Sequence, residues 1–226
     1  MHTKQEKKKI LKIRLIKRQE IWMLTIQGWV ILLTLLACLF TFFFSNLYPF
    51  LAVTSPIKAD VLVIEGWIKD DELKQAAVQI EKSSYHQVFT TGIPVPTGFY
   101  LAEYNNFAKI AAVSLEKMGV PKEKIIVVPT PGVIKDRTQA AAVALSQYLS
   151  QKNSQIKTVN LFTADAHARR SWFLFEKILT PQIKVGVIAS QPDNYNPQKW
   201  WSSSEGVRTV ISELIAYIYA LFVSTL

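Results

Sequence analysis

The hydrophobic and polar positions divide the chain into one long apolar segment and a longer alternating region. Residues 21–57 contain no charged side chain, and residues 21–44 are rich in Leu, Ile, Phe and Trp around the whole circumference of a helix. At 1.5 Å per residue, a helix over residues 21–44 reaches about 36 Å, enough to cross a hydrocarbon core of roughly 30 Å. The pattern predicts a transmembrane helix within residues 21–45, because a buried core helix this long is rarely apolar on every face.

Beyond the apolar segment, short apolar runs alternate with amphipathic stretches. Residues 46–58, which include Pro56, are expected to form a linker. The segments predicted as strands are 59–64, 87–91, 124–128, 158–163 and 183–189. One predicted helix begins at Asp70, a second ends at Met118, and two more cover residues 136–149 and 166–179. Such alternation is typical of a mostly parallel sheet covered on both faces, so residues 59–226 are predicted to form one α/β domain with five strands.

The C-terminal residues 207–226 allow two interpretations. Apolar side chains recur there with a helical period, while Arg208 and Glu213 fall on the other side. A second membrane span would bury Arg208 and Glu213 in lipid, which costs a few kcal/mol. We therefore predict a core helix packed on the sheet, with contact between its last turns and the outer membrane surface as an open alternative. The apolar positions are Val207, Val210, Ile211, Leu214, Ile215, Ile218, Leu221 and Phe222.

The basic charge is concentrated at the N-terminus. The formal net charge of the chain is +9, and residues 1–20 hold eight Lys or Arg against two Glu. By the positive-inside rule this tail stays in the cytoplasm, so the C-terminal domain is expected outside it, at the plasma (inner) membrane. A basic run can also indicate nucleic-acid binding, but its place directly before a span makes anionic lipid headgroups the simpler partner. We expect no nucleic-acid partner.

A cleaved signal peptide is the main alternative to a permanent anchor. Its apolar core is usually about 7–15 residues long and is followed by a small-x-small cleavage site. The apolar core here is longer, and residues 45–49 offer no convincing site. The segment is therefore predicted to be an uncleaved signal anchor with a single pass.

Several familiar chemistries are missing from the sequence. The only cysteine is Cys38 in the apolar segment, so neither an internal disulfide nor a cysteine-based metal site is available. The domain holds only His86 and His167, which excludes a multi-histidine metal centre. There is no dinucleotide fingerprint, P-loop, nucleophile elbow or zinc-protease motif. No metal is expected, and no cofactor is assigned.

Polar residues collect where the predicted strands end. In an open parallel sheet, ligands bind at this edge, and the first and fourth strands are usually neighbours, which places Glu65 opposite His167. Helices that begin near Asp136 and Ala166 direct free N–H groups toward the same crevice, a favourable place for an anion. We predict Glu65 and His167 as catalytic residues. The predicted ligand-binding residues are Gly92, Asp136, Arg137, Thr138 and Arg170.

Each of these residues also has a purely structural interpretation. Glu65 can pair with a lysine, His167 can be a satisfied first-turn histidine, and Asp136 can be an N-cap only. Arg169 and Arg170 are adjacent on a helix, about 100° apart, so both cannot point into one site. The adjacent pair Trp200 and Trp201 is more typical of a core or an interface than of a ligand platform.

The order of the motifs resembles that of the SanA/ElyC/YdcF family. The motifs are T-T-G after the second strand, M-G-V-P before the third, D-R-T at a helix start, T-A-D-A-H-A-R-R-S after the fourth strand, and W-W-S-S-S-E-G-V-R-x-V-x-S-E-L near the end. The resemblance covers roughly residues 59–220 and implies a Rossmann-like three-layer domain, often membrane-tethered. It also implies links to envelope integrity and peptidoglycan precursor metabolism, although the reaction of the family is not established.

By position, the residues that match the family are Glu65, Gly92, Thr138, His167 and Arg170. One departure is the turn after the first strand, where many relatives are glycine-rich and this chain has Glu65-Gly66-Trp67. The bulky Trp67 argues against a close backbone approach of a ligand at that turn.

Together, these observations suggest a membrane-anchored envelope protein that acts on, or binds, an anionic or phosphorylated envelope metabolite. The expected partners are the bilayer and an anionic small molecule or lipid-linked precursor, with His167 or Glu65 as general acid or base. A non-catalytic tethered binding module is the alternative that the short inventory of catalytic groups favours, and a third option is a scaffold whose polar loops are only structural.

Overall fold

The computed structural model describes residues 22–96, 103–152 and 155–223. The chain divides into two compact units, residues 1–42 and 43–226, and the boundary falls inside the first helix, α1 (Ile26–Leu51). In the first unit the α1 side chains are exposed and almost all apolar. The Thr34 and Thr41 hydroxyls donate to the carbonyls of Val30 and Ala37, each at 2.8 Å, so these polar groups are satisfied within the helix. Helix α1 is long and apolar enough to cross a membrane.

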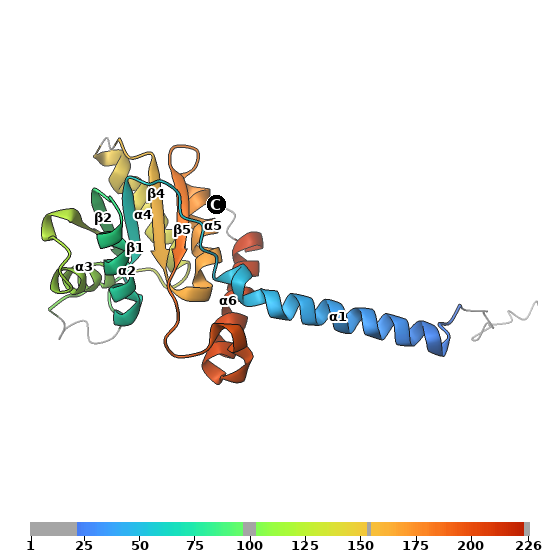
Figure 1. Cartoon of the computed structure of the whole chain (residues 1–226). Helices are drawn as coiled ribbons and strands as arrows, with labels where there is room; N and C mark the ends of the chain where they lie inside the picture. Colours follow the sequence, from blue (N-terminus) through green and yellow to red (C-terminus); the bar gives the residue numbers. More distant parts are fainter. Residues whose placement is uncertain (1–21, 97–102, 153–154, 224–226) are drawn as a thin grey trace, which may run out of the picture. The chain divides into compact units, whose positions relative to one another are not determined.

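The second unit is built on a five-stranded, entirely parallel sheet with the strand order β3-β2-β1-β4-β5 (Figure 1). The α/β fold predicted from the sequence is confirmed, and the arrangement is Rossmann-like. Strand β1 lies in the centre between β2 and β4, so the chain reverses its direction of winding there. The strands are β1 (Val61–Glu65), β2 (Gln87–Gly92), β3 (Ile125–Pro129), β4 (Thr158–Thr163) and β5 (Lys184–Ala189).

Two pairs of helices cover the two faces of the sheet. Helices α2 (Asp70–Lys82) and α3 (Phe107–Lys117) bury the face that carries Leu62 and Ile64. Helices α4 (Arg137–Gln151) and α5 (Ala168–Leu179) bury the opposite face, which carries Val61 and Val63. Because both faces are covered, all five β1 side chains are buried, which explains the continuous apolar run in its sequence. Short 3-10 turns precede β3, α5 and α6.

The predicted boundary between anchor and linker needs correction. Helix α1 does not stop at residue 45 but continues to Leu51, which is completely buried in the second unit. After the helix, Ser55 exchanges backbone hydrogen bonds with Val187 of β5, at 2.8 and 3.1 Å. The side chain of Asn160 bonds both the N–H and the carbonyl of Ile57. Residues 46–58 are thus part of the domain, because the end of α1 packs in it, Ser55 pairs with the open edge of β5, and Ile57 is bonded by Asn160.

The prediction for the C-terminal helix, α6 (Ser204–Val223), was wrong in its packing partner. Helix α6 contacts α5, the 3-10 turn η3 (Pro197–Ser202) and the last turns of α1, and it does not lie on the sheet. Both faces of the sheet are already occupied, so no apolar surface is left for it there. Of the apolar face predicted to be buried, Val210 is buried, while Val207, Ile211, Ile215, Ile218, Leu221 and Phe222 are exposed.

Candidate functional site

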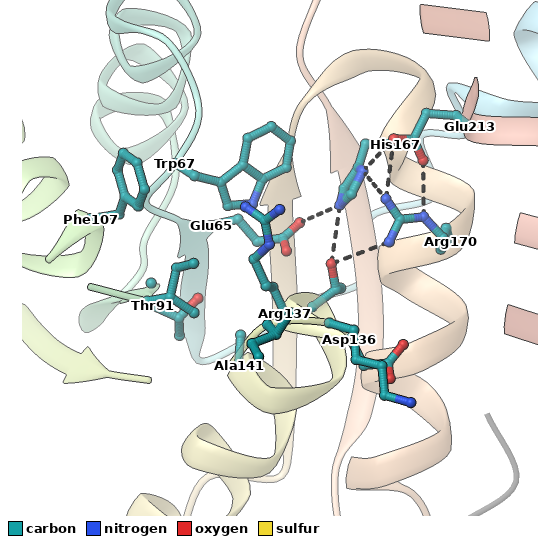
Figure 2. A pocket seen from close by; sticks show the side chains of 15 residues that line it. Glu65, Trp67, Thr91, Phe107, Asp136, Arg137, Ala141, His167, Arg170 and Glu213 are labelled. Atoms are coloured by element: carbon teal, nitrogen blue, oxygen red, sulfur yellow. Dashed lines mark hydrogen bonds and ion pairs between the residues drawn. The ribbon is translucent and has the colours of Figure 1, made fainter. Parts of the chain in front are cut away.

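A cavity of about 390 Å³ opens at the carboxyl ends of β1 and β2 (Figure 2). The loop before α4, the first turns of α4 and α5, and the side of α6 that faces the domain complete its wall. Apolar side chains of Trp67, Ile93, Phe107 and Ile134 line one part of it. The polar part brings together residues that are more than 140 positions apart in the chain, from Glu65 to Glu213.

Glu65 lies at the end of β1 and is only 1 % exposed. Its Oε2 atom accepts hydrogen bonds from the hydroxyls of Thr163, at 2.5 Å, and Ser171, at 2.6 Å. The same oxygen lies 3.7 Å from Nε2 of His167, as predicted from the pairing of β1 with β4. Two hydroxyl donors therefore stabilise a buried carboxylate directly beside an imidazole.

His167 ends a 3-10 turn, η2 (Asp165–His167), and both of its ring nitrogens have neighbours. Nδ1 lies 3.0 Å from Oε1 of Glu213, and Nε2 lies 3.3 Å from Oγ1 of Thr138. The indole of Trp67 packs edge-on against the ring, with centroids 4.7 Å apart. The imidazole is therefore held in one orientation, with Nε2 toward the cavity (Figure 2).

Two neighbours of Nδ1 require opposite protonation of the ring. Nη2 of Arg170 also lies 2.8 Å from Nδ1, and a single nitrogen cannot both donate to Glu213 and accept from Arg170. A carboxylate can only accept and a guanidinium can only donate, so Nδ1 donates to Glu213 in one tautomer and accepts from Arg170 in the other. In the tautomer with the proton on Nδ1, Nε2 accepts the hydroxyl proton of Thr138.

Glu213 joins the site from α6, and it was not among the predicted site residues. Nε and Nη2 of Arg170 donate to its two oxygens at 3.0 and 3.1 Å, a bidentate pair. Burial alone would raise the pKa of Glu213, but His167 and Arg170 outweigh it and lower the pKa to about 2. The available signal in the sequence is a carboxylate on the polar side of an apolar C-terminal helix, at the end of the W-W-S-S-S-E-G-V-R-x-V-x-S-E-L motif.

The pair with Glu213 changes the role expected of Arg170. Its guanidinium is directed at Glu213, and its other contacts in the site are with Nδ1 of His167, at 2.8 Å from Nη2, and Oγ1 of Thr138, at 3.5 Å from Nη1. Arg170 lines the cavity but is already neutralised there. The prediction that Arg169 and Arg170 diverge is confirmed, because Nε of Arg169 donates to the carbonyl of Phe50 at 2.8 Å and its guanidinium lies over the Phe50 ring.

The positive groups that remain available lie at the start of α4. Lys135 and Arg137 are exposed and line the cavity. Asp136, the N-cap residue, has left-handed backbone angles (φ 57°, ψ 37°), and its side chain makes no capping hydrogen bond, contrary to the capping interpretation. The first N–H groups of an α-helix have no partner within the helix, so this end is suited to an anion.

Gly92 lines the cavity, but its lack of a side chain has a packing reason. A Cβ atom on Gly92 would lie 2.7 Å from both the backbone nitrogen of Ala108 and Cβ of Phe107. A Cβ atom on Gly66 would lie 2.5 Å from the carbonyl oxygen of Phe107. Both glycines thus allow the first turn of α3 to approach the strand ends, and ligand contact by Gly92 stays a prediction.

A second buried polar cluster lies outside the cavity. The carboxylate of Asp165 accepts a hydrogen bond from the Tyr195 hydroxyl, and its backbone N–H donates to Ser190, whose hydroxyl donates to Glu72 at 3.0 Å. Burial raises the pKa of both Asp165 and Glu72. Trp200 is buried beside this region and Trp201 is half exposed, in agreement with a core or interface role.

The site is equipped for acid–base chemistry. Within the described residues no group of three or more His, Cys, Asp or Glu side chains is placed to hold a metal ion. What the cavity does offer is an imidazole fixed between carboxylates, a hydroxyl on Nε2, and cationic groups at its rim. A scan against protein-family models finds no match to the chain, and a search of curated proteins finds none either. The resemblance to the SanA/ElyC/YdcF family therefore rests on the sequence motifs alone.

Proposed function

We propose that this protein is a membrane-anchored envelope protein whose cavity binds and converts an anionic, phosphorylated metabolite of the peptidoglycan-precursor type. The observation that carries the proposal is His167, held by Glu213 with Nε2 directed into a cavity that has cationic groups at its rim. The motif resemblance suggests the envelope setting and the precursor class. Membership of the SanA/ElyC/YdcF family is part of the same proposal.

The anion is expected to bind between Arg137, Lys135 and the first turn of α4. Arg170 is paired with Glu213, so the ligand meets Arg137 and Lys135 as the exposed cations of the cavity wall. A guanidinium can form two parallel hydrogen bonds with a phosphate, and the helix N-terminus adds N–H donors. The apolar wall formed by Trp67, Phe107 and Ile134 leaves room for a non-polar part of the same ligand.

His167 is expected to move the proton. In the proposed reactive tautomer Nδ1–H donates to Glu213, and Nε2 is the base. When Nε2 takes a proton from the substrate or from a water molecule, the imidazolium lies between Glu213 and Glu65, both of which stabilise its charge. Oε2 of Glu65 lies 3.7 Å from Nε2, so this carboxylate can stabilise the protonated ring or orient the substrate or water molecule that gives up the proton.

The anchoring proposal rests on α1 and on the residues before it. Helix α1 crosses the inner membrane once, the eight basic residues of the tail contact anionic headgroups in the cytoplasm, and the domain faces the other side. This position exposes the cavity to lipid-linked precursors and to soluble ones. It also makes nucleic acid an unsuitable partner.

The test compares histidine and arginine variants of the full chain in lipid vesicles. Binding of pyrophosphate and of a polyprenyl phosphate is measured for wild type, Arg137→Gln and Arg208→Gln. Arg208 is the control, because it is 71 % exposed and paired with Glu205 away from the cavity. We expect Arg137→Gln to lower affinity about tenfold or more, the loss of one charge-assisted contact, and Arg208→Gln to leave it unchanged. Equal affinity in all three proteins would refute the anion site.

Turnover separates the enzyme from the binding module. His167→Gln should abolish conversion of a phosphorylated precursor, while His86→Gln, the other histidine of the domain and an exposed one, should not. A loss of about 100-fold or more is expected for removal of a general acid–base group. Binding that depends on Arg137, without turnover of any precursor tested and with His167→Gln fully functional in cells, would instead establish the non-catalytic module.

A further inference from the structure

The outer side of α6 is an unusually apolar surface. Outside α1, the large hydrophobic side chains that are exposed in the described part of the chain are concentrated on this helix, with exposures from 37 % at Ile211 to 76 % at Phe222. Val207, Ile211, Ile218 and Phe222 are spaced by four, seven and four positions, which places them in one stripe along the helix. The stripe also includes Ile215 and Leu221.

The adjoining side of α6 is already used by the fold. Val210 and Ala220 are buried there, and Leu214 and Tyr217 pack against the last turns of α1. Glu213 projects from the same side into the site, where it binds His167 and Arg170. The exposed stripe therefore cannot be buried by rotation of the helix, because rotation would remove Glu213 from its partners.

We infer that the stripe on α6 lies in the interfacial layer of the lipid bilayer, on the side of the membrane where the domain lies. This inference rests on the proposed anchoring of the chain by α1. The last turns of α1, from Phe44 to Leu51, pack against α6, so α6 lies beside the residues that follow the proposed span in the chain. The apolar stripe on α6, located at the end of the proposed span, would then contact lipid in the interfacial layer.

Two further features agree with lipid as the occupant. Tyr219 on α6 is exposed, as is Trp201 in η3, whose ring packs against Phe44 at the end of α1, and both residue types are enriched at membrane–water interfaces. The exposed polar positions of α6 are also grouped, since Arg208 and Ser212 lie together on one flank of the stripe. An apolar face with a polar flank is the pattern of a helix that lies along the interface.

Helix α6 lies on the membrane and does not cross it. It is long and apolar enough to pass as a span by composition. A crossing would carry Glu213 and Arg208 into hydrocarbon and would break the bidentate pair with Arg170. Because α6 also supplies Glu213, its seating on lipid holds the cavity close to the bilayer surface and within reach of membrane-borne substrates.

Site-directed spin labelling of the full chain tests this surface. The protein is reconstituted into vesicles of phosphatidylcholine and phosphatidylglycerol, with one nitroxide at Ile218→Cys or at Val78→Cys, each in the Cys38→Ser background. Ile218 and Val78 are a matched pair, because both are 46 % exposed and Val78 lies on α2. Wild-type protein labelled at Cys38, the sole cysteine, reports the depth of α1.

The expected result is a several-fold higher ratio of oxygen to nickel-complex accessibility at Ile218 than at Val78. Ile215→Cys, at a more exposed position of the stripe, should behave like Ile218→Cys. Equal, water-like values at Ile218 and Val78 overturn the inference, and a lipid-like value at Cys38 in the same experiment shows that the anchor still stands. A water-like value at Cys38 overturns the anchor itself. Spin–spin broadening at Ile218 that disappears on dilution with unlabelled protein would show a second copy on the stripe, and this also overturns the inference.

Discussion

At the scale of single residues, the charge of Glu213 decides how His167 and Arg170 are held. One oxygen lies 3.0 Å from Nδ1 of His167, and both oxygens accept hydrogen bonds from the guanidinium of Arg170. The carboxylate is mostly buried, with 18 % of the side chain exposed, so solvent screens these interactions only in part. The hydrogen bonds and the charges of His167 and Arg170 lower the pKa of Glu213 in spite of its burial.

Replacement of Glu213 by Gln should therefore destabilise the folded protein near neutral pH. A carboxylate whose folded pKa lies below its unfolded value contributes stability above the unfolded value and loses it as the pH falls through the folded one. For Glu213 the interval runs from 4.5 down to about 2. We expect a loss on the order of 3 kcal/mol at pH 7, measured by thermal or urea unfolding in detergent.

The same measurement contains its own control. Glu176→Gln removes an exposed carboxylate of α5 and should change stability by less than about 0.5 kcal/mol. The difference between wild type and Glu213→Gln should shrink as the pH is lowered from 4.5 toward 2. A difference that stays constant over this interval would contradict the assigned electrostatic role.

At the scale of elements, the segment after α1 is fastened to the outer edge of the sheet. Asn160 on β4 is 2 % exposed, and its amide bonds the backbone of Ile57 on both sides and the hydroxyl of Tyr85. Gly186 on β5 leaves the space for this contact, since a Cβ atom there would clash with Oδ1 of Asn160 and lie 2.8 Å from the nitrogen of Ile57. A buried asparagine and a glycine on neighbouring strands thus form one clamp.

Because Asn160 and Gly186 are in contact, the losses of stability caused by substitutions at the two positions should not be additive. Asn160→Ala should cost about 2 kcal/mol, because it removes several buried hydrogen bonds, and Gly186→Ala should cost roughly 1–3 kcal/mol through overpacking. The double variant should be more stable than the sum of the two losses implies, since removal of the Asn160 amide frees the space that the added methyl group needs. Unfolding in detergent measures all three, with the exposed Asn194→Ala as a neutral control. Strict additivity would show that the two residues act separately.

At the scale of the whole molecule, the proposed orientation places the tail and the domain on opposite sides of the membrane. Cysteine at Val78, an exposed position of α2, should react with a membrane-impermeant maleimide in cells whose inner membrane is intact. Cysteine at Thr3 in the basic tail should react only after the membrane is permeabilised. Both variants carry Cys38→Ser, and labelling of the two positions in the reverse order would refute the orientation.

The sequence by itself determined the class and order of the elements. A strand that is covered on both faces appears in the sequence as a continuous apolar run. These runs, alternating with amphipathic stretches, were enough to predict five parallel strands and the helices between them. It also placed Glu65 and His167 at one edge of the sheet, because the carboxyl ends of parallel strands meet there. The long charge-free segment predicted an apolar helix for the same reason, since its pattern depends only on neighbours along the chain.

Only the tertiary structure decided which distant surfaces meet. The packing of α6 against α5 and the end of α1 places Glu213 in the site, where it pairs with Arg170. The periodicity of apolar residues along the chain does not predict this contact. The same packing left the apolar stripe of α6 exposed, although its spacing is that of a core helix. The segment after α1 is held against the sheet because Asn160 bonds Ile57 and Val187 pairs with Ser55. Such contacts depend on which surfaces remain uncovered once the sheet has formed, and a linear pattern of apolar residues does not contain that information.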